Sequence, residues 1–164
     1  MTVRRLALGA AVVLTALLLQ GAVLSRLPGP PDLLLVVVVA FALAEGTSSG
    51  AVTGFVAGLL VDAQADHELG RVALAYALAG SFAGLVHDRP DRSRLLPLGV
   101  AAAAAALAVT AYAAQGVLLA DPRTTVSAWG SGLAATVIWC VLLAPVVVPL
   151  VGLLVRRLDD DPLR

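Results

Sequence analysis

The chain has 164 residues, of which 60% are hydrophobic and only 13% are charged. A soluble domain carries roughly 25% charged residues because its surface faces water, so most of this surface must face something apolar, and lipid is the obvious candidate. The formal net charge is zero, which gives nucleic-acid binding no electrostatic support. The single cysteine, Cys140, excludes a disulfide framework and a cysteine-based metal cluster.

Six apolar segments follow one another along the chain, and a membrane-spanning helix needs about 20 mostly apolar residues. We therefore expect an all-α polytopic integral membrane protein, with about six transmembrane helices in a single domain over residues 1–164. The expected spans are approximately residues 6–25, 32–46, 49–62, 71–87, 95–119 and 129–155. Two prolines in the last span, Pro145 and Pro149, are expected to kink it.

The first segment also has the outline of a signal peptide. Arg4 and Arg5 precede an apolar stretch that ends near the small residues Gly21 and Ala22. The stretch is longer than the apolar core of a typical signal peptide, and further spans follow it. An uncleaved first helix therefore fits better.

The second and third segments are short for membrane spans. Residues 33–44 and 50–61 are apolar, and residues 45–49 between them have the composition of a tight polar turn. With flanking residues each segment reaches about 16 residues, or roughly 24 Å at the helical rise. They are either two short spans in a locally thinned bilayer or a re-entrant hairpin.

The arginines favour two crossings, because short cytoplasmic loops are enriched in positive charge. With six spans and a cytoplasmic start, 8 of the 11 arginines lie inside and 3 lie outside. The inside set is Arg4, Arg5, Arg89, Arg92, Arg94, Arg156, Arg157 and Arg164. If residues 33–61 formed one long span or a re-entrant hairpin, later segments would flip, and the split would become 4 inside and 7 outside. We therefore expect a plasma-membrane protein with both termini in the cytoplasm.

Two stripes of small residues mark consecutive spans. The first comprises Gly50, Gly54, Gly58 and, one turn further, Asp62; the second comprises Tyr76, Gly80, Gly84 and Asp88. Spacing by four puts each set on one helix face, and small residues let helix backbones approach closely in lipid. The stripes are expected to pack on each other within the chain, with helices of a partner as the alternative.

The sequence holds little that points to catalysis or ion transport. Its acidic residues near the spans lie at their predicted ends, where water is expected to reach them: Asp32, Glu45, Asp62 and Asp88. The three neighbouring donors at residues 66–68 are too close in sequence to converge on a metal ion. Ser48 and Ser49 have no evident histidine or aspartate partner, and there is no phosphate-binding loop. We expect no enzymatic activity and no cofactor.

The order of these features resembles the bacterial rod shape-determining MreD family. The matching residues are Pro31-Asp32-Leu33-Leu34-Leu35, then Gly50-x-x-x-Gly54-Phe55-x-x-Gly58-Leu59-Leu60-x-Asp62, then Gly70, and then Leu74-Ala75-Tyr76-Ala77-Leu78-x-Gly80-x-x-x-Gly84. This part covers about a third of the chain, and the remaining helices match in number and length. The loop over residues 62–71 departs from the more glycine-rich loop that the family pattern implies.

The resemblance implies a non-enzymatic membrane component of the cell-elongation machinery that builds peptidoglycan. Its implied partners are an MreC-like bitopic membrane protein, an MreB-like cytoskeletal protein, and the wall glycosyltransferase and transpeptidase. The implied fold is similar to the substrate-binding subunits of energy-coupling-factor transporters. The residues that would form packing or partner interfaces are Asp32, Gly50, Gly54, Phe55, Gly58, Asp62, Tyr76, Gly80 and Gly84.

A substrate-binding subunit of a vitamin or small-solute transporter is the alternative function, since it would share the six-helix plan and small size. Such a subunit needs a pocket with a few convergent polar groups. The polar residues available inside the predicted spans are few: Gln20, Thr110, Tyr112, Gln115 and Trp139.

Overall fold

The computed structural model describes residues 3–22, 31–64, 69–88 and 95–159. These residues form six α-helices, and the predicted all-α fold is confirmed. The helices are α1 (Val3–Ala22), α2 (Leu33–Glu45), α3 (Thr47–Asp62), α4 (Arg71–Gly84), α5 (Leu96–Leu118) and α6 (Val126–Asp159). The donors at 66–68 and the arginines at 89–94 and 164 lie outside the described residues.

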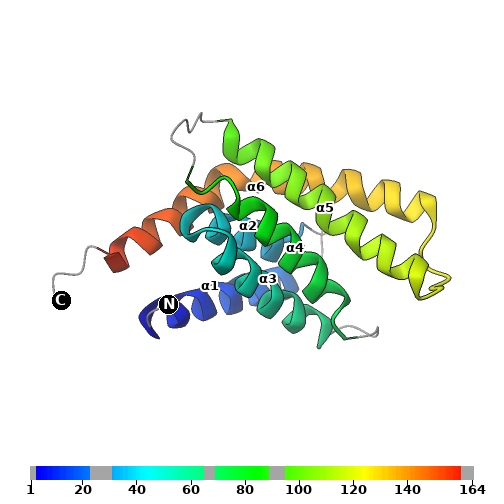
Figure 1. Cartoon of the computed structure of the whole chain (residues 1–164), viewed down its shortest axis with the longest axis horizontal. Coiled ribbons are helices and arrows are strands. Elements are labelled where there is room, and N and C mark those ends of the chain that lie inside the picture. Colours follow the sequence, from blue (N-terminus) through cyan, green and yellow to red (C-terminus); the bar gives the residue numbers. More distant parts are fainter. Residues whose placement is uncertain (1–2, 23–30, 65–68, 89–94, 160–164) are drawn as a thin grey trace.

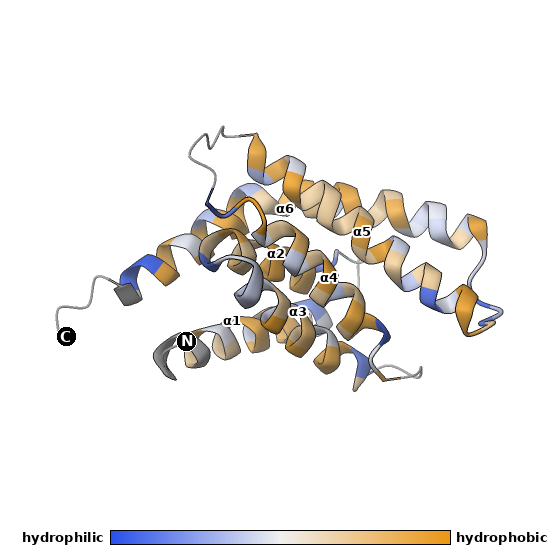
Figure 2. Cartoon of the chain, viewed as in Figure 1, coloured by the Kyte–Doolittle hydropathy of each residue, from blue (hydrophilic) through white to orange (hydrophobic). Residues whose placement is uncertain are grey.

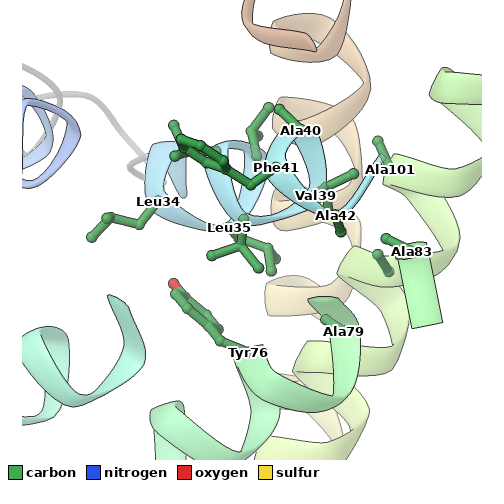
Figure 3. Close-up of a cluster of buried hydrophobic side chains, with 14 of the residues drawn as sticks. Leu34, Leu35, Val39, Ala40, Phe41, Ala42, Tyr76, Ala79, Ala83 and Ala101 are labelled. Atoms are coloured by element: carbon green, nitrogen blue, oxygen red, sulfur yellow. The ribbon is translucent and has the colours of Figure 1, made fainter. Parts of the chain in front are cut away.

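Helix α2 is the centre of the bundle. Its residues 34–42 are all buried, with exposed fractions of 3% or less. The helix is apolar on every face, as expected for a helix surrounded by others, and it contacts all five of the remaining helices. Figure 3 shows its Leu35 above Tyr76 of α4 and its Val39 toward Ala83 of α4 and Ala101 of α5, with Phe41 on the opposite side of α2. Its 13 residues extend about 20 Å, which is shorter than the roughly 30 Å hydrocarbon core of a bilayer.

One residue, Gly46, separates α2 from α3. The sequence places a polar turn at 45–49, whereas the structure puts Thr47, Ser48 and Ser49 in the first turn of α3. Gly46 has φ +92°, a conformation that side chains other than glycine rarely adopt, and its N–H donates to the Ala42 carbonyl oxygen at 2.8 Å. A single left-handed residue reverses the chain here, so no longer turn is needed.

The glycine stripes of α3 and α4 face each other along both helices. A Cβ atom built on Gly50 would overlap the Gly80 carbonyl group, and one on Gly54 would overlap the carbonyl oxygen of Tyr76. Gly58 and Gly84 make equally close approaches, to the backbones of Ala73 and Thr47. These partners run in opposite directions along the two helices, so α3 and α4 are antiparallel (Figure 1). Backbone packs directly on backbone, as small-residue faces allow in membrane proteins.

Large apolar side chains lie on the outside of this pair. Val52, Phe55 and Leu59 of α3 are between 41% and 50% exposed, and Leu74 and Phe82 of α4 are similarly exposed. A water-soluble helix pair would place its large apolar residues inside, because their burial drives folding. Lipid favours the arrangement seen here, in which small residues lie between the helices and large apolar residues lie outside.

Two helices are long and apolar enough to cross a membrane: residues 96–118, which form α5, and residues 126–157 of α6. Only 28% and 22% of the residues in their most apolar windows are buried, so most residues of these windows are at least partly exposed. Helix α6 continues through Pro145 and Pro149 for 34 residues, about 51 Å, and so extends beyond a bilayer core. Figure 2 shows apolar residues along the helices, with hydrophilic residues mainly toward the helix ends.

The bundle has two ends, which we name by a residue at each. At the Asp62 end, α1, α3 and α5 end and α2, α4 and α6 begin. At the Gly46 end, α2 and α4 end and α3 and α5 begin. At the Asp62 end, Gln20 of α1 reaches the start of α2 and Gln115 of α5 reaches the start of α4. Each helix therefore runs antiparallel to the one it follows.

Replacing Gly54 with alanine tests the backbone contact. The added methyl group meets a backbone carbonyl that cannot rotate away, so we expect Gly54→Ala to reduce stability by about 1–3 kcal/mol. The matched control is Gly132→Ala in α6, where no heavy atom lies within 4 Å of the new Cβ. Thermal unfolding in detergent, followed by circular dichroism, measures the difference. Equal midpoints for the two variants would contradict the packing argument.

Candidate functional site: a polar pocket at the Asp62 end

A pocket of about 310 Å³ lies at the Asp62 end, and all six helices contribute to it. Most of its lining is apolar, but five polar side chains converge on it: Gln20, Asp32, Tyr76, Tyr112 and Thr136. Gln20 and Tyr112 are two of the polar residues that the sequence analysis named as candidates for lining a ligand pocket. Of the others, Thr110 lines a separate groove, and Gln115 donates to the Arg71 carbonyl oxygen at 3.2 Å.

Asp32 is held in place by two hydrogen bonds. It caps the N-terminus of α2, where Oδ1 accepts from the backbone N–H of Leu35 at 3.1 Å. Its second oxygen, Oδ2, accepts from the hydroxyl of Tyr76 at 2.5 Å. The neighbouring N–H of Leu34 donates to the Gln20 side chain at 3.1 Å. Residues from α1, α2 and α4 thus meet at the beginning of α2.

Tyr76 links the glycine contact to the pocket. Its carbonyl oxygen lies against Gly54 of α3. Its side chain points toward α2, where Figure 3 shows the ring beneath Leu35. Any side chain on Gly54 would push α4 away from α3 and move the Tyr76 hydroxyl relative to Asp32. The glycine stripe therefore fixes the geometry of the pocket as well as the pairing of the two helices.

Asp62 caps the N-terminus of α4 from the last residue of α3. Oδ2 accepts from the N–H groups of Gly70 and Ala73 at 2.9 and 3.1 Å, and Oδ1 accepts from that of Val72 at 3.1 Å. The sequence placed Asp62 where water could reach it, and this prediction is wrong: the residue is only 1% exposed. A buried carboxylate needs such donors, and the N-terminal end of a helix provides them.

Arg71 joins α4 to the connection between α5 and α6. The arginine is 3% exposed, its Nη1 lies 2.9 Å from Oδ2 of Asp121, and its guanidinium carbon lies 4.4 Å from the centre of the Tyr112 ring. The hydrogen bond from Arg71, followed by the one from the backbone N–H of Arg123, lowers the pKa of Asp121 below its ordinary value of 3.8. Because Tyr112 also lines the pocket, this ion pair supports one of its walls.

The structure brings most of the predicted interface residues into one continuous arrangement. Gly50, Gly54, Gly58, Gly80 and Gly84 form the contact between α3 and α4, which leads at one end to the hydrogen bonds of Asp32, Tyr76 and Asp62. Phe55 lies elsewhere, half exposed on the outer face of α3. The side chain of Asp88 is 98% exposed, so it does not continue the packed stripe.

Sequence reasoning missed the roles of Arg71, Asp121 and Thr136. Arg71 and Asp121 are 50 residues apart, and each sits beside a predicted turn, where a charged residue is ordinarily solvated. Thr136 lies within an apolar span and gave no local signal. The burial of Arg71 could not be predicted from its neighbours in the sequence, because it depends on the ion pair with the distant Asp121.

The described side chains provide hydrogen-bonding groups in the pocket rather than a reactive centre. Among the described residues, no three His, Cys, Asp or Glu side chains lie close enough together to hold a metal ion. Ser49 donates to the Glu45 carboxylate at 2.5 Å, far along α3 from the pocket. The pocket can therefore accept an apolar group and hydrogen-bond the polar atoms beside it.

These features are consistent with a helical membrane protein, since large apolar residues lie on the outside and two helices are long enough to cross a bilayer. The profile of the family described as rod shape-determining protein MreD matches residues 6–158, nearly the whole chain, and the chain belongs to this family. Membership implies a role in rod shape determination alongside the MreB and MreC system, and the family is not known as an enzyme family. A comparison with curated proteins and solved structures finds no match.

Removing the Asp62 carboxylate should loosen the start of α4. We expect Asp62→Ala to reduce stability by about 1–3 kcal/mol, because three backbone N–H groups at 70–73 lose their acceptor in a buried place. Asp62→Asn keeps one acceptor oxygen, so its stability should lie between those of the wild type and Asp62→Ala. Hydrogen exchange measured by mass spectrometry should accelerate first at residues 70–73. Unchanged protection there would contradict the capping role.

The ion pair of Asp121 should make stability depend on pH in the acid range. The folded-state pKa is lowered, so the stabilisation is fully present above the ordinary value of 3.8 and is lost as the pH falls through the folded pKa. The difference in melting temperature between wild type and Asp121→Asn should be constant near neutral pH and shrink below about pH 4. A difference that stays constant in acid would show that the charge of Asp121 does not contribute.

Proposed function

We propose that the chain is a non-enzymatic membrane scaffold of the machinery that elongates the bacterial cell wall. Family membership supports the role in cell shape. The finer proposal is supported by the way several described polar residues are used. Asp32, Asp62 and Arg71 hold helices together. Gln20, Tyr112 and Thr136 line one pocket beside them. A protein built in this way presents fixed surfaces to its partners.

The proposed topology has six spans, with both termini in the cytoplasm. The distribution of arginines supports it, since Arg156 and Arg157 at the C-terminal end of α6 fall inside. The antiparallel order of successive helices agrees with alternate crossings. In this topology the Asp62 end, with its pocket, faces the outside of the membrane, and the Gly46 end faces the cytoplasm.

The pocket is the proposed docking place for an MreC-like bitopic protein. Such a partner has one membrane helix, and the segment that leaves the membrane on the outer side would emerge at the level of the pocket. Apolar side chains of that segment would fill the cavity, and its backbone would find hydrogen-bonding groups in Tyr112, Thr136 and Gln20. Phe55, on the exposed face of α3, is the predicted interface residue best placed to contact the partner's membrane helix. MreB-like and wall-synthesis proteins would then join through this partner.

A variant that fills the pocket tests the proposal. Val109 lines the cavity, and Val109→Trp places a large ring in it. We expect about a thirtyfold weaker affinity between the purified protein and the MreC-like partner in nanodiscs, equivalent to one central contact of about 2 kcal/mol. The control is Leu142→Trp, at a position that is 61% exposed on α6.

The same variants should be tagged at the C-terminus, crosslinked in intact cells and extracted in mild detergent. Mass spectrometry of the wild type should recover an MreC-like protein or wall synthases, and Val109→Trp should lose them while Leu142→Trp keeps them. Recovery of paired ATPases with a coupling subunit would instead identify a transporter subunit. Undiminished binding by a folded Val109→Trp variant would exclude the pocket as the docking place.

A further inference from the structure

A second hollow lies at the opposite end of the bundle, between α2 and α6. It has a volume of about 360 Å³ and is lined by apolar residues of both helices together with Arg156. We infer that this groove binds one anionic phospholipid of the cytoplasmic leaflet, with an acyl chain in the apolar part and the phosphate on Arg156. The assignment of the leaflet rests on the topology proposed above.

The apolar part of the groove is open at Gly152 of α6, which has no side chain. Gly152 lines the groove, and no heavy atom lies within 4 Å of the position that its Cβ would take. Leu43 and Ala44 of α2 form the facing wall, with Val148 and Leu153 of α6 on either side. In a bilayer, an apolar hollow of this kind is filled by a neighbouring lipid acyl chain.

The position of the hollow favours an acyl chain over a protein helix. The groove lies between α2 and α6, which already contact each other. A helix with its side chains is about 10–12 Å across, so it would have to part these two helices or lie across the mouth of the groove. A single file of methylene groups can enter between them.

Charge selects an anionic headgroup. Among the described residues that line the groove, Arg156 alone is charged. Glu45, the acidic residue at the end of α2, lines a different groove with α1 and α3, and its carboxylate accepts a hydrogen bond from Ser49. Figure 2 shows the hydrophilic patch near the C-terminal end of α6 that contains Arg156 and Arg157. Basic residues between helices at the cytoplasmic surface are suited to phospholipid headgroups.

Native mass spectrometry of the full chain, titrated with dioleoyl phosphatidylglycerol or dioleoyl phosphatidylcholine, measures the binding. We expect one retained phosphatidylglycerol, bound more tightly than phosphatidylcholine. Arg156→Gln should weaken phosphatidylglycerol binding about fivefold, the effect of one arginine near a charged lipid surface. Arg157→Gln, which removes a neighbouring charge outside the groove, should leave it near the wild-type value. Equal losses for the two variants would overturn the site in favour of general surface attraction.

Filling the groove gives a second and independent readout. Gly152→Leu places its side chain in open space, so the fold should survive while binding of both lipids falls. Gly132→Leu, at an equally open position of α6 away from the groove, is the control. Unchanged lipid binding in Gly152→Leu would overturn the inference. The isolated protein is used here, so failure of lipid binding leaves the scaffold proposal standing, and failure of partner binding leaves the lipid site standing.

Discussion

The close approach of the α3 and α4 backbones is the contact on which the rest of the bundle depends. It requires glycine on both helices, since a methyl group at Gly50, Gly54 or Gly80 would overlap backbone atoms of the neighbour. This contact sets the register of the two helices. The register in turn brings Asp62 to the N-terminal end of α4 and turns Tyr76 toward Asp32 of α2. The contact between α3 and α4 thus positions both carboxylates, Asp32 and Asp62, against their hydrogen-bond donors.

The medium explains why this contact can stabilise the fold. In lipid, burying large apolar side chains between helices gives little advantage, because lipid tails are equally apolar. Close van der Waals contact and hydrogen bonds carry the association instead. The bundle follows this rule in α3 and α4, where small residues lie inside and Phe55 or Phe82 lies outside. Helix α2 is short because it is enclosed by its neighbours, and so it need not match the bilayer by itself.

The pocket at the Asp62 end and the groove at the Gly46 end differ in chemistry. The pocket at the Asp62 end has hydrogen-bonding groups from several helices, which suits a polypeptide that brings its own amides and side chains. The groove at the Gly46 end is apolar with one arginine, which suits a lipid. A scaffold with a protein partner on one side and a lipid on the other would be oriented in the membrane by both. The same helix, α2, contributes to each hollow through opposite ends of its 13 residues.

The sequence by itself determined the helices and the faces that they would use. Apolar length predicted six helices, with ends differing by a few residues, and spacing by four put Gly50, Gly54 and Gly58 on one face. These features are local, since they depend on the helical period and on side-chain size. The family resemblance likewise depended on local order, and the profile match over residues 6–158 confirms it.

Only the tertiary structure decided which groups meet. Asp62 looked solvated because its donors lie 8 to 11 residues away on the next helix, and Arg71 looked like a loop residue because Asp121 lies 50 residues away. The turn expected at 45–49 reduced to Gly46, because a positive φ at one glycine reverses the chain. The pocket and the groove have no counterpart in the sequence. Each is a space between helices, and such a space exists only once close backbone contact has fixed where the helices lie.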